Sequence, residues 1–161
     1  MDIEIIRDSH FQYISRAADM ICLGLGDEID IVNYKGKNEK RPQYAIHFQC
    51  PWRLYNETGI ILGSYDIYTP YSKNITDDWE YDICGRPDSE SSVFDVTLKR
   101  IIIELDKCKV KDCSLSKYMD LHISFTNGWN LDTFITSSEK VKEFWRFIEF
   151  VTRTHTVVYD K

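Results

Sequence analysis

Several chemical motifs are missing from this 161-residue sequence. It contains no phosphate-binding loop and no G-x-S-x-G nucleophile elbow, and the short Gly24-Leu25-Gly26 segment lacks the rest of a dinucleotide fingerprint. The four histidines include no H-x-H or H-E-x-x-H spacing, so the spacings typical of zinc sites are also missing. The sequence therefore predicts no catalytic residue, no metal site and no cofactor.

Long apolar runs and an excess of positive charge are missing as well. No uninterrupted apolar run approaches the roughly 18 residues of a membrane span. The opening MDIEIIRDSH lacks the basic and then apolar pattern of a secretion signal. The formal net charge of −6 repels phosphate backbones. We therefore expect a cytoplasmic protein that contacts neither a membrane nor nucleic acid.

Cysteine is present without a pairing pattern. The chain has five cysteines and no C-x-x-C motif. Cys108 and Cys113 are close enough to share a metal, but no second pair completes such a site. In a chain that stays inside the cell thiols are reduced. We expect all five to be free and structurally passive: Cys22, Cys50, Cys84, Cys108 and Cys113.

The clearest positive signal predicts a β-hairpin over residues 44–68. Apolar and polar side chains alternate along its first half, with the period of a strand that buries one face. Asn-Glu-Thr-Gly at 56–59 supplies the turn, because Asn opens turns through its side chain and Gly accepts positive φ. If the ends of this turn face each other, Trp52 lies opposite Gly63 on the apolar face. We expect Trp52 to be largely buried.

A second hairpin is predicted over residues 118–136 by the same alternation. Its turn, Thr-Asn-Gly at 126–128, fits either a two-residue or a three-residue loop. The three-residue loop keeps the apolar side chains together, because it pairs Ile123 with Leu131. It also leaves Phe134 on the polar face.

Two segments have helical spacing. The first spans about 92–105, with Ser91 or Ser92 as the N-cap. The second spans 137–150, where Thr136 and Glu139 form a capping box. The expected buried stripe of this second helix consists of Val141, Phe144, Trp145 and Ile148.

The remaining segments complete an α+β fold in one domain over residues 1–161. We expect short strands at 2–6 and 107–116, and a β-prone C-terminal end. Residues 12–25 fit helix or strand, and we favour a strand over 18–25. An exposed polar loop is expected at 27–42, and a long irregular segment folded onto the body at 69–92. The predicted architecture is an antiparallel sheet of about five to seven strands, built on the two hairpins and carrying the two helices.

The chain carries, in order, RAADM followed by LGLG, then YAIHFQCPWRL, GSYDIYTP, WEYD, WNLDTFITSS and WRFIEF. This series of segments resembles a widespread family of short bacterial proteins, in which RAADM and CPWR are the most specific features. The sequence departs from the family pattern at GLGDEID, which lacks a phenylalanine before the glycine, and at WEYD, which lacks a second tryptophan. The resemblance implies a bacterial cytosolic protein of α+β fold, and it supplies no catalytic residue. An immunity-type role is a separate expectation, with which the small size, acidic charge and aromatic richness agree.

Two groups of residues are candidate sites. In the predicted hairpin Gln49 lies opposite Asp66, and His47 is the diagonal neighbour of Asp66. A histidine and a carboxylate so placed could bind a small ligand or do acid–base work. The second hairpin brings His122 near Asp132 in the same way. The ligand-binding candidates are His47, Gln49, Arg53 and Asp66. The partner-binding candidates, which combine acids with aromatic anchors, are Asp77, Asp78, Trp79, Glu80, Tyr81 and Asp88.

Two function classes remain open. The first is a non-catalytic cytosolic binding protein, of the kind that neutralises a toxin, whose acidic and aromatic surface covers a basic partner. The second is a small-ligand-binding protein or enzyme that uses the polar face of the 44–68 hairpin. Because no catalytic constellation is present, we favour the first.

Overall fold

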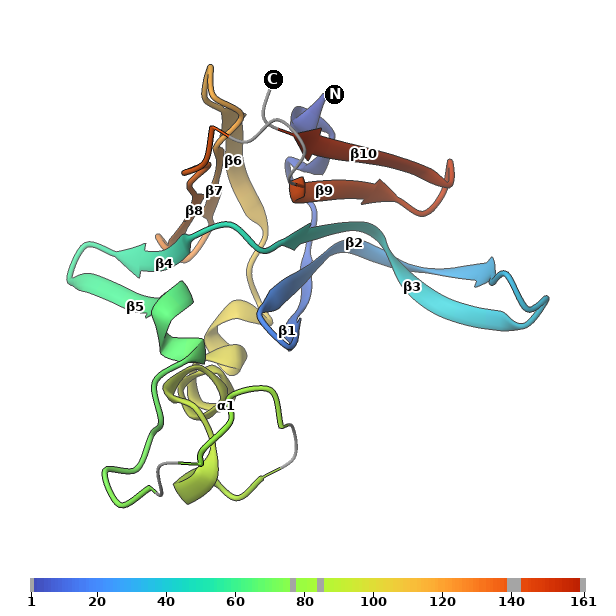
Figure 1. The fold of residues 1–161 in the computed structure, drawn as a ribbon. Coiled ribbons are helices and arrows are strands. Elements are labelled where there is room, and N and C mark those ends of the chain that lie inside the picture. Colours follow the sequence, from blue (N-terminus) through green and yellow to red (C-terminus); the bar gives the residue numbers. More distant parts are fainter. Residues whose placement is uncertain (1, 76–77, 84–85, 139–142, 160–161) are drawn as a thin grey trace.

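The computed structural model describes residues 2–75, 78–83, 86–138 and 143–159. In these residues the chain forms two five-stranded antiparallel sheets, with one α-helix, α1 (Val93–Leu105), beside them (Figure 1). The first sheet has the order β1-β2-β3-β9-β10 and the second β5-β4-β8-β7-β6. The single sheet that we expected is therefore wrong.

The first sheet consists of β1 (Phe11–Ala17), β2 (Met20–Val32), β3 (Asn38–Phe48), β9 (Glu143–Glu149) and β10 (Thr154–Tyr159). The second consists of β4 (Trp52–Asn56), β5 (Gly59–Gly63), β6 (Val110–Leu115), β7 (Leu121–Phe125) and β8 (Asn130–Thr133).

The expected 44–68 hairpin is divided between the two sheets. β3 ends at Phe48, and Pro51, which has no N–H to donate to a ladder, precedes the start of β4. Only the part from Trp52 to Gly63 is a hairpin, and its turn closes as predicted. An irregularity between Leu54 and Tyr55 shifts the register, so Gly63 pairs with Arg53 instead of Trp52. Trp52 is nevertheless buried, as expected.

The chain after β5 is a one-turn 3-10 helix, η2 (Ser64–Ile67), where the alternation had predicted more strand. The Asp66 carboxylate accepts a hydrogen bond of 2.7 Å from the Gly63 N–H at the start of this turn. This local bond competes with a ladder. The predicted pairing of Asp66 with Gln49 is therefore wrong.

The second hairpin has the predicted three-residue loop. The Phe125 N–H donates to the Trp129 carbonyl at 2.8 Å, and Gly128 adopts φ 85° in the left-handed region. Ile123 pairs with Leu131. Phe134, the one aromatic that this register places among polar residues, lies under the Arg53 guanidinium at 5.0 Å.

Residues 11–32 form β1 and β2, so the preference for a strand over 18–25 is confirmed in part. The turn between them contains Ala18 at φ 52°. The exposed loop expected at 27–42 is wrong, because β2 continues to Val32 and β3 begins at Asn38. Ile29, Ile31 and Val32 favour strand, and this preference outweighs the polar composition.

One of the two expected helices is present. α1 starts as predicted, with the Ser92 side chain accepting from the Asp95 N–H at 3.2 Å. The helix expected over 137–150 is wrong where it can be compared, because residues 143–149 are strand β9, between β3 and β10. The expected capping Glu139 and Val141 lie outside the described residues. The strand expected at 2–6 is a short 3-10 helix, η1 (Ile3–Ile6).

Both sheets and α1 contribute to one hydrophobic core. Trp52 makes edge-on ring contacts, with centroids 5.9 Å apart, both with Phe48 of the first sheet and with Phe94 of α1. Burial raises the pKa of the Cys50 and Cys113 thiols to about 11. The described cysteines, which leave out Cys84, are free. No helix in the described ranges is long and apolar enough to cross a membrane.

Candidate functional site

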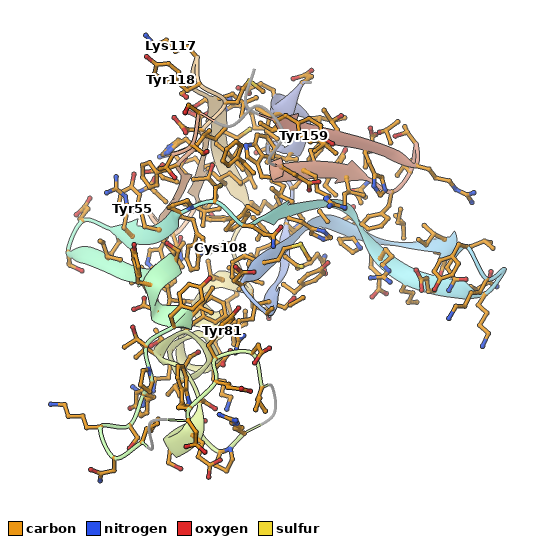
Figure 2. The ribbon with its side chains drawn as sticks, in the orientation of Figure 1. Tyr55, Tyr81, Cys108, Lys117, Tyr118 and Tyr159 are labelled. Carbon is orange, nitrogen blue, oxygen red and sulfur yellow. The ribbon has the colours of Figure 1, made fainter. Side chains whose placement is uncertain are left out.

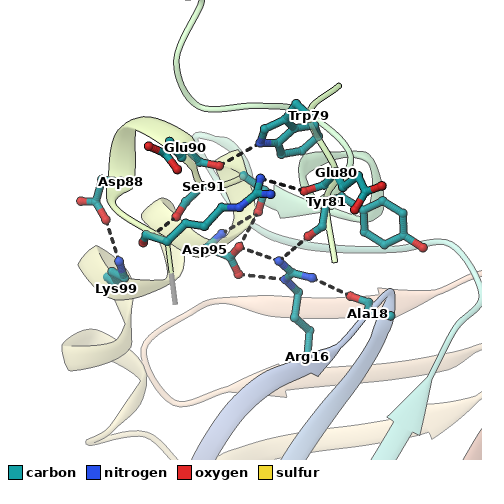
Figure 3. Close-up of polar contacts among 12 residues, drawn as sticks. Arg16, Ala18, Trp79, Glu80, Tyr81, Asp88, Glu90, Ser91, Asp95 and Lys99 are labelled. Carbon is teal, nitrogen blue, oxygen red and sulfur yellow. Dashed lines mark hydrogen bonds and ion pairs between the residues drawn. The ribbon is translucent and has the colours of Figure 1, made fainter. Parts of the chain in front are cut away.

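The long segment between β5 and α1 is fastened to the body by Arg16 of β1 (Figure 3). The Arg16 guanidinium forms two parallel bonds to the Asp95 carboxylate, at 2.8 and 2.7 Å. It also donates to the carbonyls of Tyr81 and Ala18, each at 2.8 Å. The Arg16 side chain is only 3% exposed. This one residue therefore joins β1, α1 and the 69–92 segment.

Further bonds close the segment on itself, as expected for residues folded onto the body. The Val93 N–H donates to the Thr69 carbonyl at 2.8 Å, which holds the two ends of the segment together. The Trp79 indole N–H donates to the Glu90 carbonyl at 2.8 Å (Figure 3). The Arg86 guanidinium donates to the Glu80 carbonyl at 3.2 Å. A surface built on this segment is therefore held in place before any partner arrives.

Tyrosines gather where the segment leaves β5. Tyr65 lies in the 3-10 turn η2, and Tyr68 is the residue that follows this turn. Tyr65 is 82% exposed. The Tyr68 ring packs edge-on against Tyr81 with centroids 4.7 Å apart, and Figure 2 shows Tyr81 between the turn after β5 and α1. Tyr65 and Tyr68 are thus exposed, whereas Tyr81 is half-buried against the core.

A carboxylate from another strand turn joins these tyrosines. The Tyr68 hydroxyl donates to Asp19 at 3.0 Å, and the Gln49 side-chain amide donates to the same carboxylate at 3.4 Å. Burial and the Asp19 carboxylate raise the pKa of Tyr68 to about 12. We call this set the tyrosine–carboxylate surface. It consists of Asp19, Tyr65, Tyr68, Glu80 and Tyr81.

Two of the sequence-predicted partner residues, Glu80 and Tyr81, are part of this surface as defined above. Glu80 and Asp78 are exposed, and Trp79 lines a cleft of about 520 Å³ with Asp78 and Arg86. Asp88 forms an exposed pair with Lys99 at 2.6 Å, so its charge is partly compensated (Figure 3). Asp77 lies outside the described residues.

Sequence reasoning missed Asp19, Tyr65 and Tyr68. The alternation of residues 59–68 predicted a strand, which would have put Tyr65 in the core. The i, i+3 spacing of Tyr65 and Tyr68 after Gly63 was the available signal for a helical turn.

The predicted ligand-binding set does not form one site. Its four side chains contact different residues. His47 lies between Cys22 and Arg146 on the first sheet, where burial and then the Arg146 charge lower its pKa. Gln49 bonds Asp19, and Asp66 bonds the backbone beside it.

Arg53 instead belongs to a polar row across the second sheet. The register aligns Arg53 on β4 with Asp132 on β8, His122 on β7 and Ser114 on β6. The predicted proximity of His122 and Asp132 is confirmed by a hydrogen bond of 2.6 Å from ring Nδ1 to the carboxylate. The Arg53 guanidinium also stacks on the Tyr55 ring at 5.0 Å, and Tyr55 projects from β4 in Figure 2.

A shallow cavity of about 270 Å³ adjoins this row. It has the residue types of a serine hydrolase, but the described residues include no hydrogen bond from Ser114 to His122. Nor do three His, Cys, Asp or Glu side chains of the described chain meet in a way that could hold a metal ion.

Comparison of the chain with protein-family models, with curated proteins and with solved structures found no match. Any function proposed for this protein rests on its own sequence and geometry.

Proposed function

We propose that this protein is a non-catalytic cytoplasmic binding protein that neutralises a basic protein partner through its tyrosine–carboxylate surface. The observation that carries the proposal is Tyr65, a large aromatic side chain that is 82% exposed. It precedes by three residues Tyr68, whose hydroxyl is bonded to the Asp19 carboxylate.

The chemistry of the surface favours a basic protein. Tyrosine is enriched among the residues that dominate binding energy, because it covers a large area and loses little conformational entropy. Its ring face attracts lysine and arginine, and the adjacent Asp19 and Glu80 offer charge-assisted hydrogen bonds. The net charge of −6 adds a longer-range attraction that speeds encounter.

The test is capture from the native cytosol followed by association kinetics with the captured protein. We expect Tyr65→Ala to weaken binding about tenfold or more, as hot-spot truncations do. We expect Asp78→Lys with Glu80→Lys to slow association, and salt to slow the wild-type rate, since the Debye length is about 8 Å at physiological ionic strength.

A matched control reverses the charge of two acidic residues that lie outside this surface. Glu57→Lys with Glu104→Lys changes the net charge by the same amount, and both residues are exposed, outside this surface and outside strands β2 and β3. Two results would refute the assignment of binding to this surface. One is an affinity for the captured protein that Tyr65→Ala leaves unchanged, and the other is an association rate that both double charge reversals slow equally.

A second candidate function is small-ligand binding at the row from Arg53 to Ser114. It is favoured by the His122–Asp132 hydrogen bond beside the cavity and by the guanidinium fixed between two rings. Native mass spectrometry of protein purified without denaturation tests it. A bound small molecule that is present in wild type and absent in Arg53→Met would favour this function over partner neutralisation.

A further inference from the structure

Strands β2 and β3 extend well beyond their neighbours in the first sheet. β1 pairs with β2 only as far as Leu25, and β9 pairs with β3 only from Tyr44. Gly26 still donates to the His10 carbonyl, and the Gln43 carbonyl still accepts from the Phe150 N–H. Beyond these two bonds, in the described chain, β2 and β3 pair with each other, from Glu28 with Pro42 to Val32 with Asn38. We call residues 27–43 the arm, which projects from the body in Figure 1. A two-stranded ribbon has two open edges and is only marginally stable on its own.

The pairing pattern fixes which backbone groups the open β2 edge presents. The Asn33 N–H donates to the Lys37 carbonyl at 2.9 Å, which identifies a hydrogen-bonded pair next to the turn. Hydrogen-bonded and non-bonded pairs alternate in an antiparallel ladder. Ile31 and Ile29 therefore bond β3, and the N–H and C=O of Glu28, Asp30 and Val32 face the open edge.

The two edges of the arm differ in how they are protected. Natural sheets block exposed edges with lysine and proline. The β3 side of the arm has both, in Lys37, Lys40, Arg41 and Pro42. The β2 side has neither, and reads Asp-Glu-Ile-Asp-Ile-Val from residue 27 to 32. The β2 edge therefore carries acidic and β-branched residues, and it lacks the lysine and proline that the β3 edge has.

We propose that the β2 edge of the arm binds an extended basic segment of a protein partner by strand addition. On one face such a segment would place lysine or arginine beside Glu28 and Asp30, and opposite charges across strands are favourable. On the other face it would place apolar side chains beside Ile29 and Ile31. The matching sequence alternates basic and apolar residues. Its backbone bonds to Glu28, Asp30 and Val32 supply affinity, and the alternation supplies specificity.

Charge also argues against a second copy of this chain as the occupant. A two-fold pairing of β2 with β2 would bring Glu28 and Asp30 close to the same acids of the other copy. The Lys40–Glu28 pair at 2.6 Å does not prevent binding, because both side chains are more than half exposed and such pairs contribute little. The arm is separate from the tyrosine–carboxylate surface, so each proposal can hold without the other.

The experiment uses the full chain and a synthetic end-blocked peptide of about eight residues, a common strand length, that alternates lysine and valine. We expect binding, with slowed hydrogen exchange at the amides of Glu28, Asp30 and Val32. A peptide with glutamate in place of lysine, and one N-methylated on its bonding edge, should not bind.

A matched pair of proline variants separates the two edges. Asp30→Pro removes an outward N–H of β2 and leaves the β2–β3 ladder, because proline is tolerated where the N–H faces solvent. Lys40→Pro does the same on the β3 edge. We expect Asp30→Pro to weaken peptide binding about tenfold or more, and Lys40→Pro to leave it nearly unchanged. Asp30→Asn, which keeps the N–H, should give an intermediate loss.

Three results would overturn the proposal. The first is no binding of the lysine–valine peptide to wild type, and the second is binding that Asp30→Pro and Lys40→Pro change equally. The third is concentration-dependent self-association in sedimentation velocity that either proline variant abolishes, which would assign the edge to a second copy of the chain.

Discussion

Gly24 is the glycine whose missing side chain the fold uses most directly. A Cβ at this position would lie 2.4 Å from Cε1 of Tyr13, whose ring covers the strand from the neighbouring β1. Gly63 is different, because a Cβ there would lie 3.6 Å from the Trp52 carbonyl, an ordinary contact, and its φ of −144° is extended backbone. Crowding of the Trp52 indole, which the predicted register would have required, does not occur.

We predict that Gly24→Ala destabilises the protein by about 1–3 kcal/mol, because the Tyr13 ring must move. Gly63→Ala should stay within about 0.5 kcal/mol of wild type. Urea unfolding measures both. In a Tyr13→Ala background the cost of Gly24→Ala should largely disappear. An undiminished cost in that background would show that the strain lies elsewhere.

At the scale of elements, the Arg16–Asp95 pair joins β1 to α1. Burial raises the pKa of Asp95, but the hydrogen bonds from Arg16 and Ser92 and the guanidinium charge outweigh burial, so the pKa lies below its usual value. The folded pKa is thus below the unfolded value of about 3.9. The Arg16–Asp95 pair therefore contributes its full stability above the unfolded pKa, and this contribution is lost as the pH falls through the folded pKa.

We predict that Asp95→Asn lowers the free energy of unfolding at pH 7 by about 3 kcal/mol, because it leaves Arg16 buried without its anionic partner. The difference from wild type should shrink as the pH falls below about 4. Urea unfolding across this pH range is the measurement. Asp112→Asn, which breaks the exposed Arg7–Asp112 pair, is the control and should change little. A constant difference down to acid pH would contradict the linkage.

Elements were predictable from sequence where local chemistry decides them. The Ser92 N-cap and the helical spacing of the apolar residues after it predicted α1. The Thr-Asn-Gly turn predicted the second hairpin and the length of its loop. β9 was not predictable in this way. Phe144, Trp145 and Ile148 are buried at helical spacing, but they lie in a strand between β3 and β10 with buried side chains on both faces. A strand buried on both faces has no clean alternation, so its pattern imitates a helix.

The candidate surface was predictable only in part, for a related reason. Trp79, Glu80 and Tyr81 could be chosen because acids and aromatics adjoin in sequence. Asp19 joins Tyr68 only because the β1–β2 turn and η2 meet in space. No local pattern records that contact.

At the scale of the molecule, Trp52 connects the two sheets and α1. It begins the second sheet, contacts Phe48 of the first, and contacts Phe94 of α1. Its buried indole N–H has no hydrogen-bond partner among the residues that the structure describes. The ring therefore contributes through packing and not through its polar group.

We predict that Trp52→Ala costs about 3–5 kcal/mol, and that Trp52→Phe costs clearly less, because Phe keeps much of the ring and removes the unpaired donor. Denaturant midpoints followed by far-UV circular dichroism and by tryptophan fluorescence measure this. The two probes should shift together in both variants, since the sheets share one core. An unchanged midpoint for Trp52→Ala would contradict the packing described here.

The position of β9 has a consequence for the order in which the molecule can assemble during synthesis. β3 ends at Phe48, whereas β9, the strand that pairs with its far edge, begins at Glu143 and is therefore made much later. Until then the edge of β3 that contains Ala45 and Ile46, both fully buried in the finished fold, has no neighbour. Pairing between distant segments slows folding and exposes unpaired edges to aggregation. A nascent chain halted before residue 143 should therefore bind chaperones, and release from them should coincide with the arrival of β9.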